Sequence, residues 1–167
     1  MATRGVVYVH SAPSALCPHL EWAIGEVLDV RVTLDWTPQP AAPNAMRAEL
    51  SWQAEPGCGA RLASALLAWG QQLRFEVTEE PSPGTEGERW SGTPGLGLFH
   101  AITGIHGDIV VQEDQLRAAL SRAETVSTTD GLVEELRTLL GKAWDDELET
   151  FRHAGDGAPV RWLHQVV

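Results

Sequence analysis

The sequence predicts an α+β protein built on a mainly antiparallel sheet. Segments in which apolar and polar residues alternate, as in half-buried strands, are interleaved with segments in which apolar residues recur every three or four positions, as in helices. The second half also places two helical segments in direct succession, which is typical of α+β chains and not of alternating α/β chains. With 167 residues, the chain is long enough to bury a core.

The first half begins with a strand, a helix and a long hairpin. Gly5–His10 is apolar on both faces, as in an interior strand. Ser14 can cap a helix that ends near Asp29 and carries apolar residues at three-four spacing. Arg31–Trp36 and Arg47–Gln53 both alternate strictly, and the proline-rich stretch between them predicts a long hairpin loop.

A second helix and a fourth strand complete this half. Gly57–Trp69 repeats the helical spacing, and Leu73–Thr78 alternates again. The resulting order, βαββαβ, is that of the ferredoxin-like split βαβ unit, in which both helices cover one face of the sheet. The first and last of these strands should be neighbours.

The pattern of the second half of the sequence predicts strands and helices in the order ββααβ. We assign residues 1–80 to the ferredoxin-like unit, 81–95 to an acidic loop rich in proline and glycine, and 96–167 to a second α+β unit, with one continuous domain as the alternative. The elements expected after the loop are a hairpin of Leu96–Thr103 and Asp108–Val111, helices at Gln112–Glu124 and Asp130–Phe151, and a strand at Pro159–Val167.

The charge balance excludes some classes of partner. Acidic residues number 23 and basic residues 12, giving a net charge of -11, which repels phosphate backbones and anionic lipid. We therefore expect no binding to nucleic acid or membranes. The start of the chain lacks a signal-peptide core, and Cys17 and Cys58 are expected to be free thiols, so the sequence predicts a cytoplasmic protein.

Two groups of residues are weak candidates for catalysis. His100, His106 and Asp108 lie near one predicted hairpin end, where an imidazole and a carboxylate could act as an acid/base pair; simple turn chemistry is the alternative. Cys17 at a helix start, with His19 nearby, has the outline of a thiol nucleophile, or is an inert buried thiol. Neither group forms a complete catalytic motif.

No metal and no cofactor are expected. Cys17 and His19 supply only one half of a zinc motif, which normally pairs two such halves. The glycine-rich stretch at residues 92–97 lacks the Lys-Ser/Thr of a phosphate loop.

Three residues are candidates for contact with a protein partner. Trp90 lies in a polar, glycine-rich stretch and suits an exposed anchor, with packing onto the domain as the alternative. Arg47 and Arg74 belong to the charged outer face of the predicted sheet. That face either stays solvated or receives the second half of the chain or another protein.

Four stretches carry a resemblance to a known family. They are Arg4-Gly-Val-Val-Tyr-Val-His-Ser-Ala-Pro13, Ala15-Leu-Cys-Pro-His-Leu-Glu-Trp22, Leu34-Asp-Trp-Thr-Pro-Gln-Pro40 and Phe75-Glu-Val-Thr-Glu-Glu-Pro-Ser-Pro83. The chain resembles, over essentially its whole length, uncharacterised actinobacterial proteins grouped as a domain of unknown function. The resemblance implies a cytoplasmic protein with an accessory role near fatty-acid synthesis, and it brings no catalytic residues with it.

Two functional hypotheses follow. The first is a non-catalytic accessory or regulatory module that contacts another protein or a second copy of itself, and the acidic charge favours a basic partner surface. The second is a small enzyme acting on an acyl or other hydrophobic substrate through a His/Asp or Cys/His pair. A deep apolar pocket would favour the enzyme, and an exposed apolar patch would favour the partner.

Overall fold

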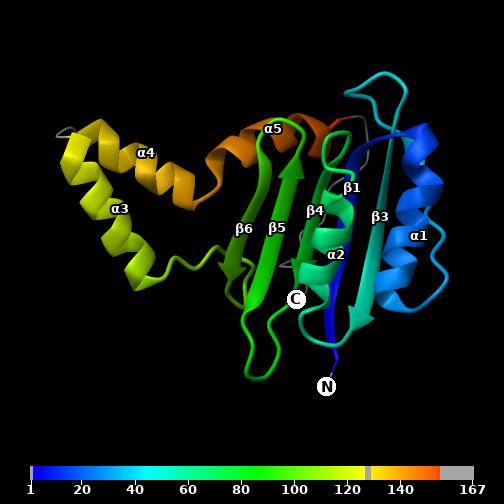
Figure 1. The fold of residues 1–167 in the computed structure, drawn as a ribbon, viewed down its shortest axis with the longest axis horizontal. Helices are drawn as coiled ribbons and strands as arrows, with labels where there is room; N and C mark the ends of the chain where they lie inside the picture. Colours follow the sequence, from blue (N-terminus) through cyan, green and yellow to red (C-terminus); the bar gives the residue numbers. More distant parts are fainter. Residues whose placement is uncertain (1, 127–128, 155–167) are drawn as a thin grey trace.

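The computed structural model describes residues 2–126 and 129–154 of the chain. Within these residues, six strands form one antiparallel sheet in the order β2-β3-β1-β4-β5-β6 (Figure 1). The strands are β1 (Thr3–Pro13), β2 (Thr37–Pro38), β3 (Ala45–Ala54), β4 (Arg74–Glu79), β5 (Gly87–Thr93) and β6 (Gly97–Thr103). The helices are α1 (Cys17–Leu28), after a short 3₁₀ turn at Ser14–Leu16, α2 (Cys58–Leu67), α3 (Glu113–Val126), α4 (Thr129–Leu139) and α5 (Lys142–Arg152).

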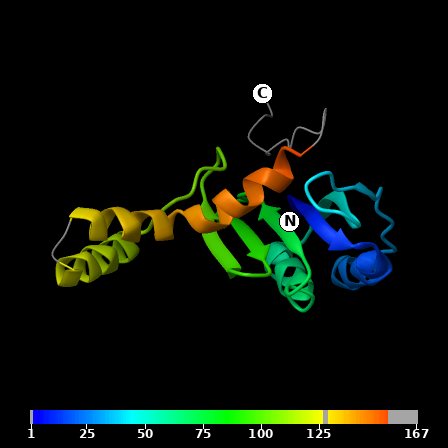
Figure 2. The same ribbon diagram turned by 90° about the horizontal axis from the view of Figure 1, so that it is seen from above.

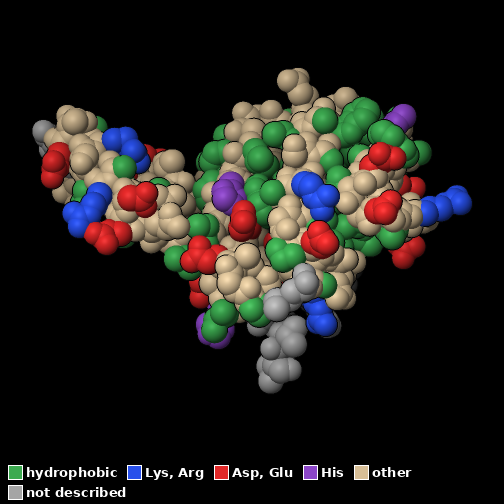
Figure 3. Space-filling model, turned by 60° about the horizontal axis from the view of Figure 1, so that its bottom comes forward, with side chains coloured by type: hydrophobic (Ala, Val, Ile, Leu, Met, Phe, Trp, Pro, Cys, Tyr) green, Lys and Arg blue, Asp and Glu red, His purple; other side chains and the backbone are tan. Residues whose placement is uncertain are grey.

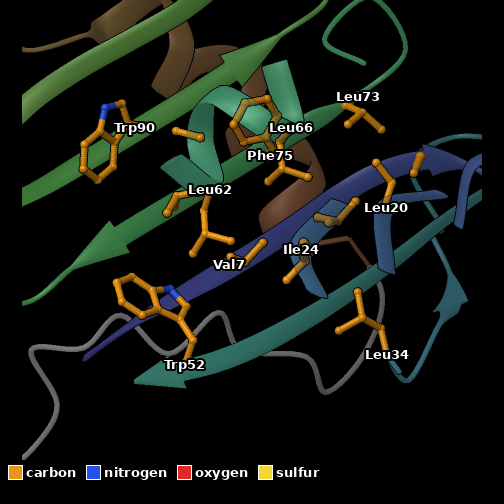
Figure 4. Close-up of a cluster of buried hydrophobic side chains, with 14 of the residues drawn as sticks. Val7, Leu20, Ile24, Leu34, Trp52, Leu62, Leu66, Leu73, Phe75 and Trp90 are labelled. Carbon is orange, nitrogen blue, oxygen red and sulfur yellow. The ribbon is translucent and has the colours of Figure 1, made fainter. Parts of the chain in front are cut away.

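The hydrophobic core lies between the sheet and helices α1 and α2. Val7 and Phe75 point from the strands toward Ile24 and Leu62 of the helices, and all four are fully buried (Figure 4). Val77 of β4 belongs to the same buried cluster. The alternation of the strands and the three-four spacing of the helices thus meet in one apolar layer.

The remaining helices occupy different places. Helix α5 lies on the sheet face opposite α1 and α2, whereas α3 and α4 pack against each other and extend away from the sheet (Figure 2). We call α3 and α4 together the arm. No helix in the described part of the chain is both long and apolar enough to cross a lipid bilayer.

The α+β class and the antiparallel sheet are confirmed. Strand β1 pairs antiparallel with both β3 and β4, so the predicted first and fourth strands are neighbours. The predicted helices at Ser14–Asp29 and Gly57–Trp69 appear as α1 and α2, each shorter by a few residues.

The strand expected at Arg31–Trp36 is wrong. This segment is irregular, and only the two residues of β2 pair with β3. The cause is Glu21 on α1, because its Oε1 accepts hydrogen bonds from the Leu34 backbone NH at 2.8 Å and from the Trp36 indole NH at 3.0 Å. These bonds tie the segment to the helix instead of to a strand.

The loop expected at residues 81–95 is wrong over its second half. Residues 87–93 form β5, which pairs with β4 on one side and with β6 on the other. The hairpin expected between Leu96–Thr103 and Asp108–Val111 is correspondingly replaced by the β5–β6 hairpin. Only a bridge between Thr103 and Ile109 joins the second segment to the sheet.

The single helix expected at Asp130–Phe151 is two helices. Gly141 has a φ of 69°, which cannot continue a right-handed helix, and it separates α4 from α5. The strand expected at Pro159–Val167 lies outside the described residues.

Candidate functional site

A carboxylate lies at the centre of the sheet, on the face covered by α5. It belongs to Glu76 of β4, whose side chain is completely buried. The neighbours Phe75 and Val77 point into the apolar core, so strand alternation places Glu76 on the opposite face. Burying a charge without partners costs far more than a protein of this size can offset, so the groups around Glu76 decide its role.

Three side chains from three different elements bind this carboxylate. His10 of β1 donates from Nε2 to Oε2 at 2.7 Å, and Arg152 of α5 donates from Nε to the same oxygen at 2.9 Å and from Nη2 to Oε1. Ser91 of β5 donates to Oε1 at 3.2 Å. His10, Ser91 and Arg152 are themselves buried. We call these four residues the Glu76 cluster.

The partners of Glu76 within the cluster keep its carboxylate ionised despite its burial. Burial alone would raise the pKa of Glu76, but the hydrogen bonds and charges of His10 and Arg152 outweigh burial and lower this pKa to about 2. Burial would likewise lower the pKa of Arg152, and Glu76 and Asp145 raise it instead. A carboxylate held ionised in this way is suited to fixing α5 on the sheet and unsuited to acting as a general acid or base near neutral pH.

The cluster predicts a specific pH dependence of stability. The pKa of Glu76 is lowered on folding, so ionised Glu76 adds to the free energy of unfolding. This added stability is complete above about pH 4.5 and is lost as the pH falls toward 2. Between pH 6 and pH 3 the loss should be about 2 kcal/mol. Urea unfolding of the wild type and of Glu76→Gln at both pH values checks this, since the difference between the two proteins should shrink at pH 3. A difference that is equal at both values would contradict it.

Further polar contacts fasten α5 to the same face. Arg74 of β4 donates to Glu147 at 3.0 Å and lies 4.4 Å from the centre of the Phe151 ring. Arg47 of β3 donates to the carbonyl oxygen of Ala154 at 2.7 Å. Arg47 and Arg74, which the sequence marked as interaction candidates, therefore bind a later part of their own chain.

The position of His10 depends on an irregularity in β1. The pairing of β1 shifts register between Val9 and Ala12 on the β3 side and between Val9 and Ser11 on the β4 side. Such a bulge re-aims the side chain at the shift. Tyr8, two residues earlier, stacks on the His10 ring at 5.8 Å, so both rings lie on the α5 face.

An open cleft of about 530 Å³ lies at the base of the arm. It is lined by Arg89, His106, Gly107, Asp108, Ile109, Leu140, Asp145 and Arg152. Two of the predicted acid/base residues, His106 and Asp108, therefore share this cleft, although no interaction joins them and both are exposed. His100 does not line the cleft, because it pairs with Glu88 at 2.7 Å and stacks on Trp90 at 5.1 Å.

The structure does not bring Cys17 and His19, the predicted nucleophile and its neighbouring imidazole, together. Cys17 is buried, with its sulfur 3.8 Å from the carbonyl oxygen of Pro13, and burial together with the charge of Glu21 raises its pKa. His19 is exposed and stacks on Trp69 at 5.5 Å. Over residues 2–126 and 129–154, no group of three or more His, Cys, Asp or Glu side chains could hold a metal ion.

Trp90 is not the exposed anchor that the sequence suggested. It is 5% exposed, because every second residue of β5 faces α2 and the core, and Trp90 is one of these residues. A Cβ on Gly59 of α2 would lie 2.6 Å from its ring, which shows how closely the helix packs against the indole. The alternative, packing onto the domain, is the one observed.

Among the described residues, five of the seven exposed large apolar side chains that lie on helices belong to the arm. Ala119 and Ala123 are its only buried residues. Its exposed large apolar side chains are Leu116, Leu120, Val126, Val133 and Leu136, and Leu140 follows directly after α4. Acidic and basic side chains are interspersed along it (Figure 3). A pair of helices with so small a shared interior is typical of a surface that is completed by another molecule.

Sequence reasoning missed the Glu76 cluster. Glu76 lies on the same face of β4 as Arg74, the charged face that the sequence predicted either to stay solvated or to receive the second half of the chain or another protein. No contact of Glu76 with His10 or Arg152 was predicted. The available signal was the position of His10 at the end of an otherwise apolar strand and of Glu76 in the middle of another. Neither signal identifies Arg152, which is 76 residues away from Glu76.

Comparison with known proteins supports one part of the resemblance seen in the sequence, the assignment to a domain of unknown function. No curated protein and no solved structure matches the chain. The profile of a family described as a protein of unknown function (DUF3145) matches residues 6–165. Because this match spans nearly the whole chain, the protein belongs to the DUF3145 family.

Proposed function

We propose that this protein is a non-catalytic interaction module that docks on a partner protein through the arm. The observation that carries the proposal is the set of exposed apolar side chains on α3 and α4. These two helices extend away from the sheet (Figure 2). Taking a leucine or valine side chain from full exposure to full burial contributes about 1.5 to 3 kcal/mol, and those of the arm, which are 38% to 58% exposed, would each gain about half of that on docking. The arm therefore offers substantial binding free energy to a complementary surface.

The charges of the arm indicate what kind of partner fits. Residues 113–139 hold six carboxylates and three arginines. Each arginine already pairs within the arm, as Arg117 with Glu113, Arg122 with Glu135 and Arg137 with Glu134. The excess is negative, and the whole chain has a net charge of -11. A second copy would bring like charges together, so the proposed partner presents an apolar groove with a basic rim.

The body of the protein supports the arm. The order β2-β3-β1-β4 with α1 and α2 on one face supports a ferredoxin-like unit in residues 1–80, to which β5 and β6 add two strands. The Glu76 cluster holds α5 on the other face, and α5 follows α4 directly. This rigid base limits the orientations that the arm can take, which lowers the entropic cost of docking. An accessory role beside fatty-acid synthesis stays a prediction.

The test combines a photo-crosslink with a binding measurement. A photoreactive phenylalanine analogue at position 136 should crosslink to a partner in native cells. Leu136→Glu should then weaken the affinity of the purified partner at least about tenfold in calorimetry, because a charge in an apolar contact is unfavourable. Ser121→Glu adds the same charge at an exposed polar position of α3 and should change the affinity less than about twofold.

Three outcomes would contradict the docking proposal. One is a crosslink to a second copy of the chain. Another is an identified partner that binds both variants as tightly as the wild type. The third is an equal loss for Ser121→Glu and Leu136→Glu with unchanged helix content, since that would indicate general repulsion by charge.

A small enzyme is the second candidate, and one observation favours it. His106 and Asp108 share the cleft at the base of the arm with the apolar side chains of Ile109 and Leu140. If this cleft hydrolyses acyl compounds, p-nitrophenyl acyl esters should be cleaved faster by the wild type than by His106→Ala or Asp108→Asn. Equal rates would remove this candidate.

A further inference from the structure

Trp22 is the exposed tryptophan of the described chain. Its side chain is 66% exposed, whereas the other described tryptophans are buried or half-buried. Val30, which follows α1, is 58% exposed. Together they flank an open groove of about 550 Å³, whose other lining residues are Pro18, Glu21, Gly25, Glu26, Asp29, Arg31 and Val32. We call this the Trp22 groove.

The groove is built into the backbone. Asp29 takes a left-handed conformation with a φ of 53°, which ends α1 and turns the chain back along the helix. The Val30 NH then donates to the carbonyl oxygen of Gly25 at 3.2 Å. A Cβ on Gly25 would lie 2.7 Å from the Val30 oxygen, so only glycine allows the returning segment to lie this close.

The same segment is the one that the sequence wrongly predicted as a strand. Leu34 and Trp36 are fixed by Glu21 of α1, at 2.8 and 3.0 Å. The returning chain therefore forms a fixed second wall for the groove instead of extending the sheet. A departure from the local pattern that is held by specific contacts is often found at functional sites.

The charges around the groove define its ligand. Glu26 and Asp29 are exposed beside Trp22, and Arg31 is the one basic residue in the lining. An indole face attracts a guanidinium or ammonium group, and nearby carboxylates strengthen that attraction. Val30 and Pro18 provide apolar surface for a residue next to the cation. We propose that the Trp22 groove binds an extended, positively charged protein segment, with an arginine or lysine over Trp22 and an apolar residue beside Val30.

This site is separate from the arm. Helix α1 and the arm lie at opposite ends of the molecule in both ribbon views (Figures 1 and 2). The inference goes beyond the proposed function, because it gives the chain a second docking surface. A protein with both surfaces is an adaptor that can hold two partners at once.

The experiment is an NMR titration of the ¹⁵N-labelled full chain with the blocked peptide acetyl-Arg-Leu-Arg-Leu-Arg-amide at low salt. Signals of the Trp22 indole and of residues 25–32 should shift first. Trp22→Ala should weaken binding about three- to fivefold. Glu26→Gln should weaken it about twofold, whereas Glu55→Gln, an equal charge change at an exposed loop position, should have less effect.

Several results would overturn the inference. These are a Trp22→Ala protein that binds as the wild type does, equal effects of the Glu26 and Glu55 substitutions, or equal binding of the peptide with glutamate in place of arginine. Shifts at Trp22 that depend on protein concentration without peptide would identify a second copy as the occupant. The titration does not involve the arm, so its outcome is independent of the crosslinking result.

Discussion

Replacing Arg152 with methionine is expected to lower the free energy of unfolding by about 3 to 5 kcal/mol. The side chain is 5% exposed and binds both oxygens of Glu76. Methionine keeps most of the buried stem but leaves a carboxylate with only His10 and Ser91 as partners. Urea denaturation at pH 7 measures the loss.

A second variant separates the charge from the packing. Adding Glu76→Gln to Arg152→Met removes the unpaired charge, so the double variant should be more stable than Arg152→Met alone. Arg74→Ala is the matched control on the same face, because it loses a half-exposed ion pair with Glu147 and should cost about 1 kcal/mol or less. A double variant no more stable than the single one would show that the loss arises from packing.

Glu79→Ala is expected to cost about 2 to 4 kcal/mol. Glu79 is 6% exposed, and its two oxygens accept hydrogen bonds from the backbone NH groups of Gly57 and Gly59, both at 2.7 Å. The residue before α2 is Gly57, which has no side chain to cap the helix. Glu79 of the neighbouring strand therefore caps α2, and its negative charge also complements the helix dipole.

Hydrogen exchange should locate this effect. The amides at the start of α2 should exchange faster in Glu79→Ala, while those in the middle of β1 keep their protection relative to global unfolding. Glu80→Ala, at the adjacent and half-buried position, should change stability by less than about 0.5 kcal/mol. Equal losses for the two variants would contradict the capping role.

The elements that the sequence predicted well are those with a strong apolar pattern. β3, β4, α1 and α2 have an apolar side that repeats every two or every three to four residues, and β1 contains a continuous apolar run. β5 was missed because its composition is typical of a loop. Its Gly92 is required by packing instead, since a Cβ there would lie 2.3 Å from the Phe75 ring. A pattern of residue types does not contain that contact.

The candidate sites depended on contacts between distant parts of the chain. Glu76 finds His10 at a separation of 66 residues and Arg152 at 76. Such pairs are decided by how the layers stack, and one sequence without relatives gives no measure of stacking. The Cys17–His19 candidate fails for a local reason, because Cys17 is buried while His19, two residues later, is exposed.

The two points at which the chain enters and leaves the arm both lie against β6. The Val110 NH donates to the carbonyl oxygen of Ile102 at 2.9 Å, and Gly141 packs so closely on Phe99 that a Cβ would lie 2.5 Å from the ring. The arm can therefore be exchanged as a unit. A short linker between these two anchor points could replace it, or a foreign helical hairpin could be grafted there, without breaking any strand of the sheet.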